Sequence, residues 1–428
     1  MYTKFLCALL LASAAPVWAG PGNAERMRAE PVSFNAALHL AQQQAPEQIA
    51  AASMTQAARL DAIPAGSLPK PKLLFGIDNL PINSVDRFSV SNDFMTMRRI
   101  GLMQEFPNHD KRAAQQAIAQ SEIGLGVSLQ GTARITVSNN VAAAWLTRYS
   151  SEQQLRLLAD LRAENQRFAQ VVAAQFAAGN AALVDILAPK LEAAELDTLD
   201  DALQEQQRVA IASLKRWLGD RGSAPLQGSP PPWLAIKPSS QQWHDRVAAH
   251  PTLGRLRALL DAADARVAAA QAEKHPDWAV ELSYQERNRP FSDMISLQFS
   301  VDLPIFAKQR LDPSIAARLA ARNARVAELD AMQREQHANL DAQLAQVARL
   351  TQALTRQNAT LIPLAQEKIR LSTAAWSAGT ASLSDVMLAR REGQMAALRA
   401  LELDNQRMLA LAALHYNYGT FATSGAAP

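Results

Sequence analysis

The chain has almost no cysteine. Its single cysteine among 428 residues is Cys7, which lies in an N-terminal segment typical of a secretory signal peptide. Lys4 precedes an apolar stretch from Phe5 to Val17, and Ala19 is a small residue suited to the cleavage site. Cleavage after Ala19 would leave a mature chain without thiols. That excludes disulfides, thiolate metal sites and cysteine nucleophiles, and it suits an oxidising compartment.

The alternative for this segment is a membrane anchor that is retained. The apolar run is shorter than the roughly 20 residues that span a bilayer, so we expect residues 1–19 to be removed. Cys7 lacks the small-residue context that precedes a lipid-bearing cysteine, so we do not expect lipidation.

Aromatic residues are few, at 6% of the chain, and neither charge sign is in large excess. The 43 Lys and Arg residues nearly balance the 40 Asp and Glu residues, which gives no strong field for binding nucleic acid. No window after the leader has the pattern of a transmembrane helix, so any membrane span would have to consist of strands. The motifs GxSxG, HExxH and GxxxxGK[ST] are absent, and the seven histidines show no helical ligand pair. We therefore expect no enzyme activity, no cofactor and no metal site.

The chain contains an internal repeat, and such repeats decide the whole fold. The segment from Phe176 to Asp185 (FAAGNAALVD) matches the segment from Trp376 to Asp385 (WSAGTASLSD) at an offset of 200 residues. The sequence then divides into four parts after the signal peptide: a first repeat at 20–219, a Pro-rich linker at 220–238, a second repeat at 239–420 and a flexible tail at 421–428.

Each repeat contains two segments with the alternation of β-strands. Ile295, Leu297 and Phe299 alternate with polar residues, and this pattern over about ten residues is typical of a transmembrane barrel strand. A half-buried strand in a soluble sheet would also show it. The expected strands span residues 72–80, 96–106, 277–286 and 293–303.

Each repeat also contains two long helical stretches. The expected helices span residues 108–178, 182–218, 308–378 and 382–417. A continuous helix over 108–178 would be roughly 100 Å long at 1.5 Å per residue. Helices of this length cannot bury their apolar stripes in one compact domain, so they imply coiled-coil-like packing.

Four strands per chain are too few to close a membrane barrel, since the smallest have about eight. An open sheet in lipid would leave edge amides unpaired at several kcal/mol each. Several copies must therefore contribute to one barrel, and this argument alone allows two, three or more.

The repeated helix–strand–strand–helix order resembles the TolC-like outer-membrane efflux proteins over essentially the whole mature chain. The segments Gly76–Ile82 (GIDNLPI), Arg99–Pro107 (RIGLMQEFP) and Lys111-Arg112 are most similar to the heavy-metal (CzcC- and CusC-like) branch. The resemblance implies an α plus membrane β-barrel fold: a homotrimer with a 12-stranded outer-membrane barrel continuous with a periplasmic α-helical tunnel. It also implies two partners, a periplasmic adaptor (membrane fusion) protein and an inner-membrane RND transporter, with heavy-metal cations as cargo.

In this family the turns between the long helices form the periplasmic mouth and dock the adaptor. The matching residues of this chain are Gly179 and Asn180 in the first repeat and Gly379 and Thr380 in the second. An ordinary helix C-cap would explain both glycines equally well.

Asp185 and Asp385 lie six residues after these glycines and are the candidate gate residues, since the family places an aspartate at the second position. The chain departs from the family pattern nearby, with Ala381 in place of an arginine and Leu388 in place of a second aspartate. The alternative is that each aspartate stabilises the first turn of a helix through the helix dipole.

Three methionines near one strand, Met95, Met97 and Met103, suggest soft-metal contacts, but we expect them to be loop or lipid-facing residues.

Two alternatives to a metal channel stay open. One is a duct for drugs or for type I protein secretion, and the other is a periplasmic coiled-coil scaffold without a pore.

Overall fold

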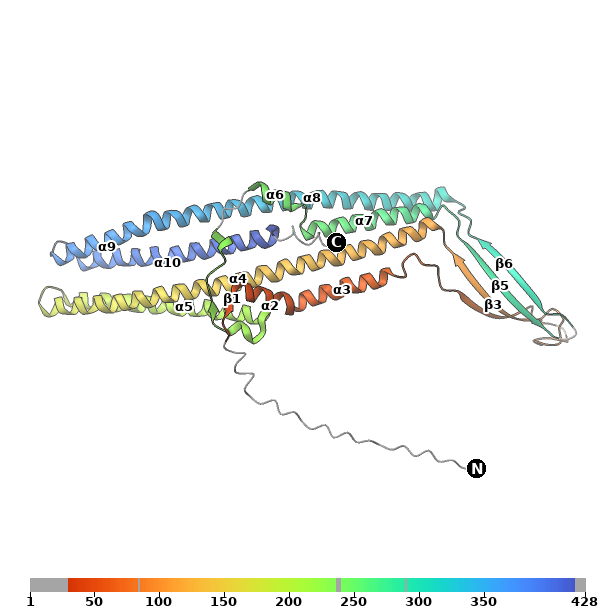
Figure 1. Ribbon diagram of the computed structural model, residues 1–428, viewed down its shortest axis with the longest axis horizontal. Coiled ribbons are helices and arrows are strands. Elements are labelled where there is room, and N and C mark those ends of the chain that lie inside the picture. The colour runs from red at the N-terminus through yellow and green to blue at the C-terminus, as the bar shows by residue number, and fades with distance from the viewer. Residues whose placement is uncertain (1–29, 84, 236–239, 289–290, 420–428) are drawn as a thin grey trace, which may run out of the picture.

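The computed structural model describes residues 30–83, 85–235, 240–288 and 291–419. The expected signal peptide and the tail at 421–428 lie outside these residues. The molecule is elongated, with long helices side by side and a β-sheet at one end (Figure 1). The ends of the long helices that lie away from the sheet are called the tip below.

The two halves of the chain contain the same sequence of main elements. The first half contains β1 (Val32–Ser33), α2 (Phe34–Gln44), α3 (Pro46–Ala62), β2 (Lys72–Asp78), β3 (Met97–Phe106), α4 (His109–Ala177) and α5 (Leu187–Leu218). The second half contains α6 (Ser240–Val247), α7 (Pro251–Ala272), β5 (Trp278–Arg287), β6 (Met294–Val301), α8 (Ala307–Arg356), α9 (Ile362–Ser377) and α10 (Leu383–Leu414). Between them lies β4 (Leu226–Gln227), which pairs in parallel with β1.

The 69-residue helix α4 is the longest element. It contains no proline, and the side chain of Asn108 caps it by accepting a 2.9 Å hydrogen bond from the backbone N–H of Lys111. Helices α3 and α7 both pack against it. The backbones approach closely at Gly126, where an added Cβ would lie 2.9 Å from the Cα of Thr55.

The expected helix over residues 308–378 is interrupted. A π-helical turn at Gln357–Leu361 separates α8 from α9. Pro363 follows this turn, and a proline inside a helix removes one backbone hydrogen bond while its ring crowds the carbonyl four residues earlier. A π turn relieves that crowding by widening the helix locally.

The sheet joins the two halves. Its strand order is β2-β3-β5-β6, and all neighbours are antiparallel. The central β3–β5 pair runs from Met97 opposite Arg287 to Phe106 opposite Trp278. Strands β2 and β6 are therefore the two edges of the sheet.

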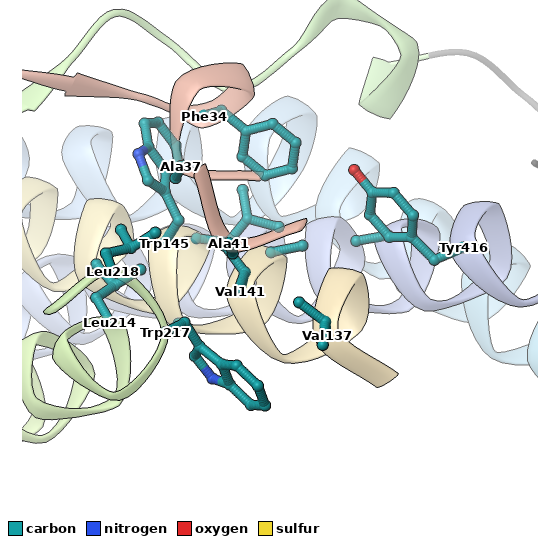
Figure 2. Close-up of a cluster of buried hydrophobic side chains, with 14 of the residues drawn as sticks. Phe34, Ala37, Ala41, Val137, Val141, Trp145, Leu214, Trp217, Leu218 and Tyr416 are labelled. Carbon is teal, nitrogen blue, oxygen red and sulfur yellow. The ribbon is translucent and has the colours of Figure 1, made fainter. Parts of the chain in front are cut away.

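A hydrophobic cluster at mid-length, called the waist core below, also joins the halves (Figure 2). Phe34 of α2 lies edge-on to Trp145 of α4, with ring centroids 5.4 Å apart. The second half contributes Val347, Met408 and Tyr416. Neither α2 nor this core is among the elements expected from the sequence.

Candidate functional site

The tip consists of two turns with the same backbone geometry, residues 178–182 and 378–382, where Figure 1 shows the α4–α5 and α9–α10 connections at the left. Gly179 and Gly379 have φ values of 78° and 74°, a region that favours glycine. The backbone N–H of Asn180 donates to the carbonyl of Gln175 at 2.9 Å, and that of Thr380 donates to Ala375 at 2.9 Å. This C-cap geometry explains the need for glycine.

The two candidate gate aspartates lie just after the tip turns, Asp185 in a short 3-10 turn before α5 and Asp385 in the first turn of α10. The Asp385 carboxylate accepts hydrogen bonds from the Ser382 hydroxyl at 2.7 Å and the Ser382 backbone N–H at 3.1 Å. Those bonds hold the pKa of Asp385 below its ordinary value, with the hydroxyl as the larger cause. Asp185 accepts a 2.8 Å hydrogen bond from the backbone N–H of Ala182. Asp385 is exposed and caps the first turn of α10, whereas Asp185 is half-buried and caps the 3-10 turn that precedes α5. Both positions are compatible with a role in the gate.

The cap in the first repeat differs from that in the second. Ala182 has no side-chain oxygen to accept a bond from the first turn, and residues 183–186 form a 3-10 turn before α5 begins. Ser382 caps α10 reciprocally with Asp385. Leu388, one turn further along α10, is 54% exposed.

One face of the sheet is apolar and exposed to solvent across all four strands. The register aligns the residues of this face in rows, including Leu73, Leu102, Leu282 and Leu297 in one row and Phe75, Ile100, Tyr284 and Ile295 in the next. These eight side chains are 43–75% exposed. An exposed apolar surface of this extent indicates a membrane or a large partner.

The opposite face of the sheet is polar. Arg99 lies between Asp78 and Glu281 of the neighbouring strands, at 3.4 Å from a carboxylate oxygen of each. The expectation for the methionines is wrong for two of them. Met97 and Met103 alternate in phase with Arg99 and therefore lie on this polar face, while Met95 precedes the strand as expected.

An ion cluster that the sequence analysis missed lies between the halves near the tip. Arg390 of α10 is 5% exposed, and its guanidinium contacts both carboxylate oxygens of the buried Glu192 of α5, at 3.2 and 3.4 Å. It also contacts Glu164 of α4 at 2.9 Å and lies 4.5 Å from the ring centroid of Phe168. The repeat offset of 200 residues aligns Arg390 with Lys190 and Glu192 with Glu392. It does not show that the side chains of Arg390 and Glu192 contact each other.

The residues that the structure describes hold neither a metal-ligand group nor a membrane-spanning helix. Within the ranges that the structure describes, no three His, Cys, Asp or Glu side chains are grouped so that they could hold a metal. None of the described helices combines the length and apolarity needed to cross a membrane.

Comparison with protein families gives a match in the second half. Residues 244–420 match the family described as outer membrane efflux protein. No curated protein matches the chain.

Solved structures resemble the chain over nearly its full length. CusC is 17% identical with a TM-score of 0.74, covering 96% of this chain and 100% of CusC. The outer membrane protein VceC of Vibrio cholerae is 19% identical with a TM-score of 0.71, covering 90% and 96%. The CmeC outer membrane channel of Campylobacter jejuni is 12% identical with a TM-score of 0.73, covering 97% and 94%. The expected TolC-like fold of the chain is therefore confirmed.

Proposed function

We propose that this chain is the outer-membrane channel of a tripartite efflux pump and conducts its cargo passively. The observation that carries the proposal is the sheet, which has one apolar and one polar face and continues into the long helices. In a closed barrel the apolar face would meet lipid and the polar face would line the pore. The match of residues 244–420 to the outer membrane efflux family supports the same function.

The proposed assembly is a homotrimer. The two edge strands β2 and β6 need partners, because unpaired edges are costly in lipid. Three copies would give a 12-stranded barrel in the outer membrane, and the helices would form a tunnel in the periplasm. A periplasmic adaptor protein would dock at the tip turns, through Gly179, Asn180, Gly379 and Thr380, and an RND transporter of the inner membrane would supply the energy.

The proposed cargo is heavy-metal cations, on the resemblance of the segments at 76–82 and 99–107 to the heavy-metal branch. A duct for drugs or secreted proteins is the second candidate. The comparison of structures does not separate the cargoes, because the chain is about as similar to VceC and CmeC as it is to CusC. Deletion of the gene and growth on copper, silver, zinc, cobalt, cadmium and a panel of drugs separates these cargoes. Sensitivity to one or two metals, restored by the gene on a plasmid, supports metal efflux, and sensitivity to drugs alone contradicts it.

A periplasmic scaffold without a pore predicts a different extraction behaviour. A barrel resists a carbonate wash of the membranes, whereas a scaffold leaves with the soluble fraction. Release of the protein by carbonate would therefore overturn the channel proposal.

The gate proposal concerns the charge of Asp185 and Asp385. Six carboxylates around the mouth of a trimer would attract cations. We expect the double variant Asp185→Asn/Asp385→Asn to lose cation preference in planar bilayers, because asparagine keeps an oxygen for capping but carries no charge. An unchanged ratio of cation to anion permeability would remove both aspartates from the gate.

A further inference from the structure

The second half of the chain exposes an apolar segment where the sheet continues into helix α8 (Figure 1). Leu303, Ile305 and Phe306 are 71%, 64% and 71% exposed. Phe306 has a φ of 59°, in a region that a bulky side chain rarely adopts. Large apolar side chains held in an exposed turn indicate a surface that something else covers. Residues 303–306 are called the rim segment below.

The equivalent segment of the first half is closed by polar contacts. Residues 303–308 (LPIFAK) align with residues 106–111 (FPNHDK) at an offset of 197, with the proline and the lysine in register. The backbone N–H and the side-chain amide of Asn108 donate to Asp277 at 2.7 and 3.0 Å, and the Nζ of Lys111 donates to the same carboxylate at 2.8 Å. Asp277 directly precedes β5, in the other half of the chain. One carboxylate therefore joins the two halves at this level.

The rim segment lacks these polar groups. Ile305 takes the place of the asparagine, and Lys308 takes the place of the lysine. Asp277 is itself matched by Lys72, because each follows a proline of the repeat at an offset of 205. In the proposed barrel, β6 of one copy lies beside β2 of the next, so Lys308 would approach Lys72 of the neighbour, which has its own partner in Glu105. The junction between copies therefore has no carboxylate where the junction within the chain has Asp277.

The basic residues that follow the rim segment are not neutralised. Among the residues that the structure describes, no carboxylate pairs with Lys308 or Arg310, and both side chains are exposed. The next acidic residue of α8, Asp312, pairs with Lys274 at 2.7 Å. Asp302, on the other side in sequence, follows the polar alternation of β6. Two positive charges thus lie beside an exposed apolar surface, which suits a ligand with an anionic group and an apolar body.

We infer that the rim segment binds an anionic phospholipid of the periplasm-side leaflet of the outer membrane. The phosphate pairs with Lys308 and Arg310, and the acyl chains cover Leu303, Ile305 and Phe306. Basic residues beside an apolar surface at a membrane are typical of sites for anionic head groups. The inference rests on the proposed channel and identifies a lipid site at each junction between its copies. A trimer holds about three such lipids, one for each copy.

The level of the rim segment along the sheet favours a lipid over a protein partner. Leu303 continues the alternation of Phe299 and Val301 past the end of β6, so it extends the apolar face of the sheet. Val301 lies opposite Trp278, whose ring stacks on that of Phe106 with centroids 4.2 Å apart. Aromatic rings gather at the level of the lipid head groups in membrane proteins. The rim segment therefore begins where the apolar face ends, at the depth expected for a lipid phosphate.

Native mass spectrometry of the purified protein in detergent tests the site, because one spectrum reports both the assembly and the lipids that it retains. We expect phosphatidylglycerol added to the delipidated trimer to be retained at about one lipid per copy, and phosphatidylcholine, whose head group has no net charge, to be lost. Lys308→Gln/Arg310→Gln should lower the retained phosphatidylglycerol roughly ten-fold. Arg325→Gln/Arg334→Gln is the matched control, since it removes two positive charges from the same helix roughly 20 Å further along. The control should retain the lipid as the unaltered protein does.

A second measurement decides the matter if the variant does not assemble. The temperature at which the unaltered trimer dissociates should rise with phosphatidylglycerol, but not with phosphatidylcholine or inorganic phosphate. Equal responses to the two lipids, unchanged retention in Lys308→Gln/Arg310→Gln, or an equal loss in the control each overturn the lipid site. An equal response to inorganic phosphate assigns the basic residues to a free anion and also overturns it. An unaltered protein found only as monomers contradicts the proposed channel instead, and retention that depends on Lys308 and Arg310 still reports the lipid site in that case.

Discussion

Arg390 carries its charge into the interior of the helical region, where its side chain and that of Glu192 are each only 6% exposed. Removal of one partner of a buried pair leaves the other charge uncompensated, at a cost of about 3–5 kcal/mol. We therefore expect Arg390→Met to lower the free energy of unfolding by about this amount in denaturant titrations followed by circular dichroism in detergent. The double variant Arg390→Met/Glu192→Leu should recover most of the loss, because it removes both buried charges.

The matched control at the residue scale is Arg399→Met. Arg399 pairs with Glu402 on the surface of the same helix, and both side chains are about half exposed. Surface pairs contribute about 0–1 kcal/mol, so this variant should remain close to the unaltered protein. Equal losses at Arg390 and Arg399 would show that the cluster between the halves does not stabilise the fold.

At the scale of elements, strand β6 presents one face to the proposed lipid and the other to the proposed pore. Leu297 lies on the apolar face and Gln298 on the polar face, and both are exposed in the single chain. An arginine on the lipid face of a barrel costs about 2–4 kcal/mol at the bilayer midplane. We expect Leu297→Arg to reduce the amount of trimer assembled in outer membranes several-fold, and Gln298→Arg to leave it near normal. Equal assembly of the two variants would contradict a lipid-facing surface on the side of Leu297.

The elements also differ in how far the sequence predicted them. The alternation at Ile295, Leu297 and Phe299 indicated both the strand and its apolar face, because a period of two is specific to strands. Residues 308–378 were expected as one helical stretch with Pro363 inside it, and the π turn between α8 and α9 was not predicted, since a proline is compatible with either a kink or a π turn. The ion cluster at Arg390 was missed because it depends on how helices from different halves pack.

At the scale of the whole molecule, the same reasoning explains why the waist core was missed. Helix α2 is only 11 residues long, and its apolar residues gain a partner only when α4 and α5 lie beside it. The internal repeat indicates only features that occur twice, whereas α2 packs in a single cluster whose residues come from both halves. A core of this kind should make the two halves unfold together.

Phe34 offers the sharpest test of that cooperativity. Its side chain is 4% exposed and contacts Trp145, which is fully buried, and Trp233 at a centroid distance of 6.1 Å. Phe→Ala substitutions in a core cost about 3–5 kcal/mol. We expect Phe34→Ala to shift the thermal unfolding of the whole chain as one transition, whereas Phe88→Ala, at a side chain that is 58% exposed, should change stability by about 0.5 kcal/mol or less. Two separate transitions in Phe34→Ala, with the second half unaffected, would show that the waist core does not couple the halves, and the sheet would then be what joins them.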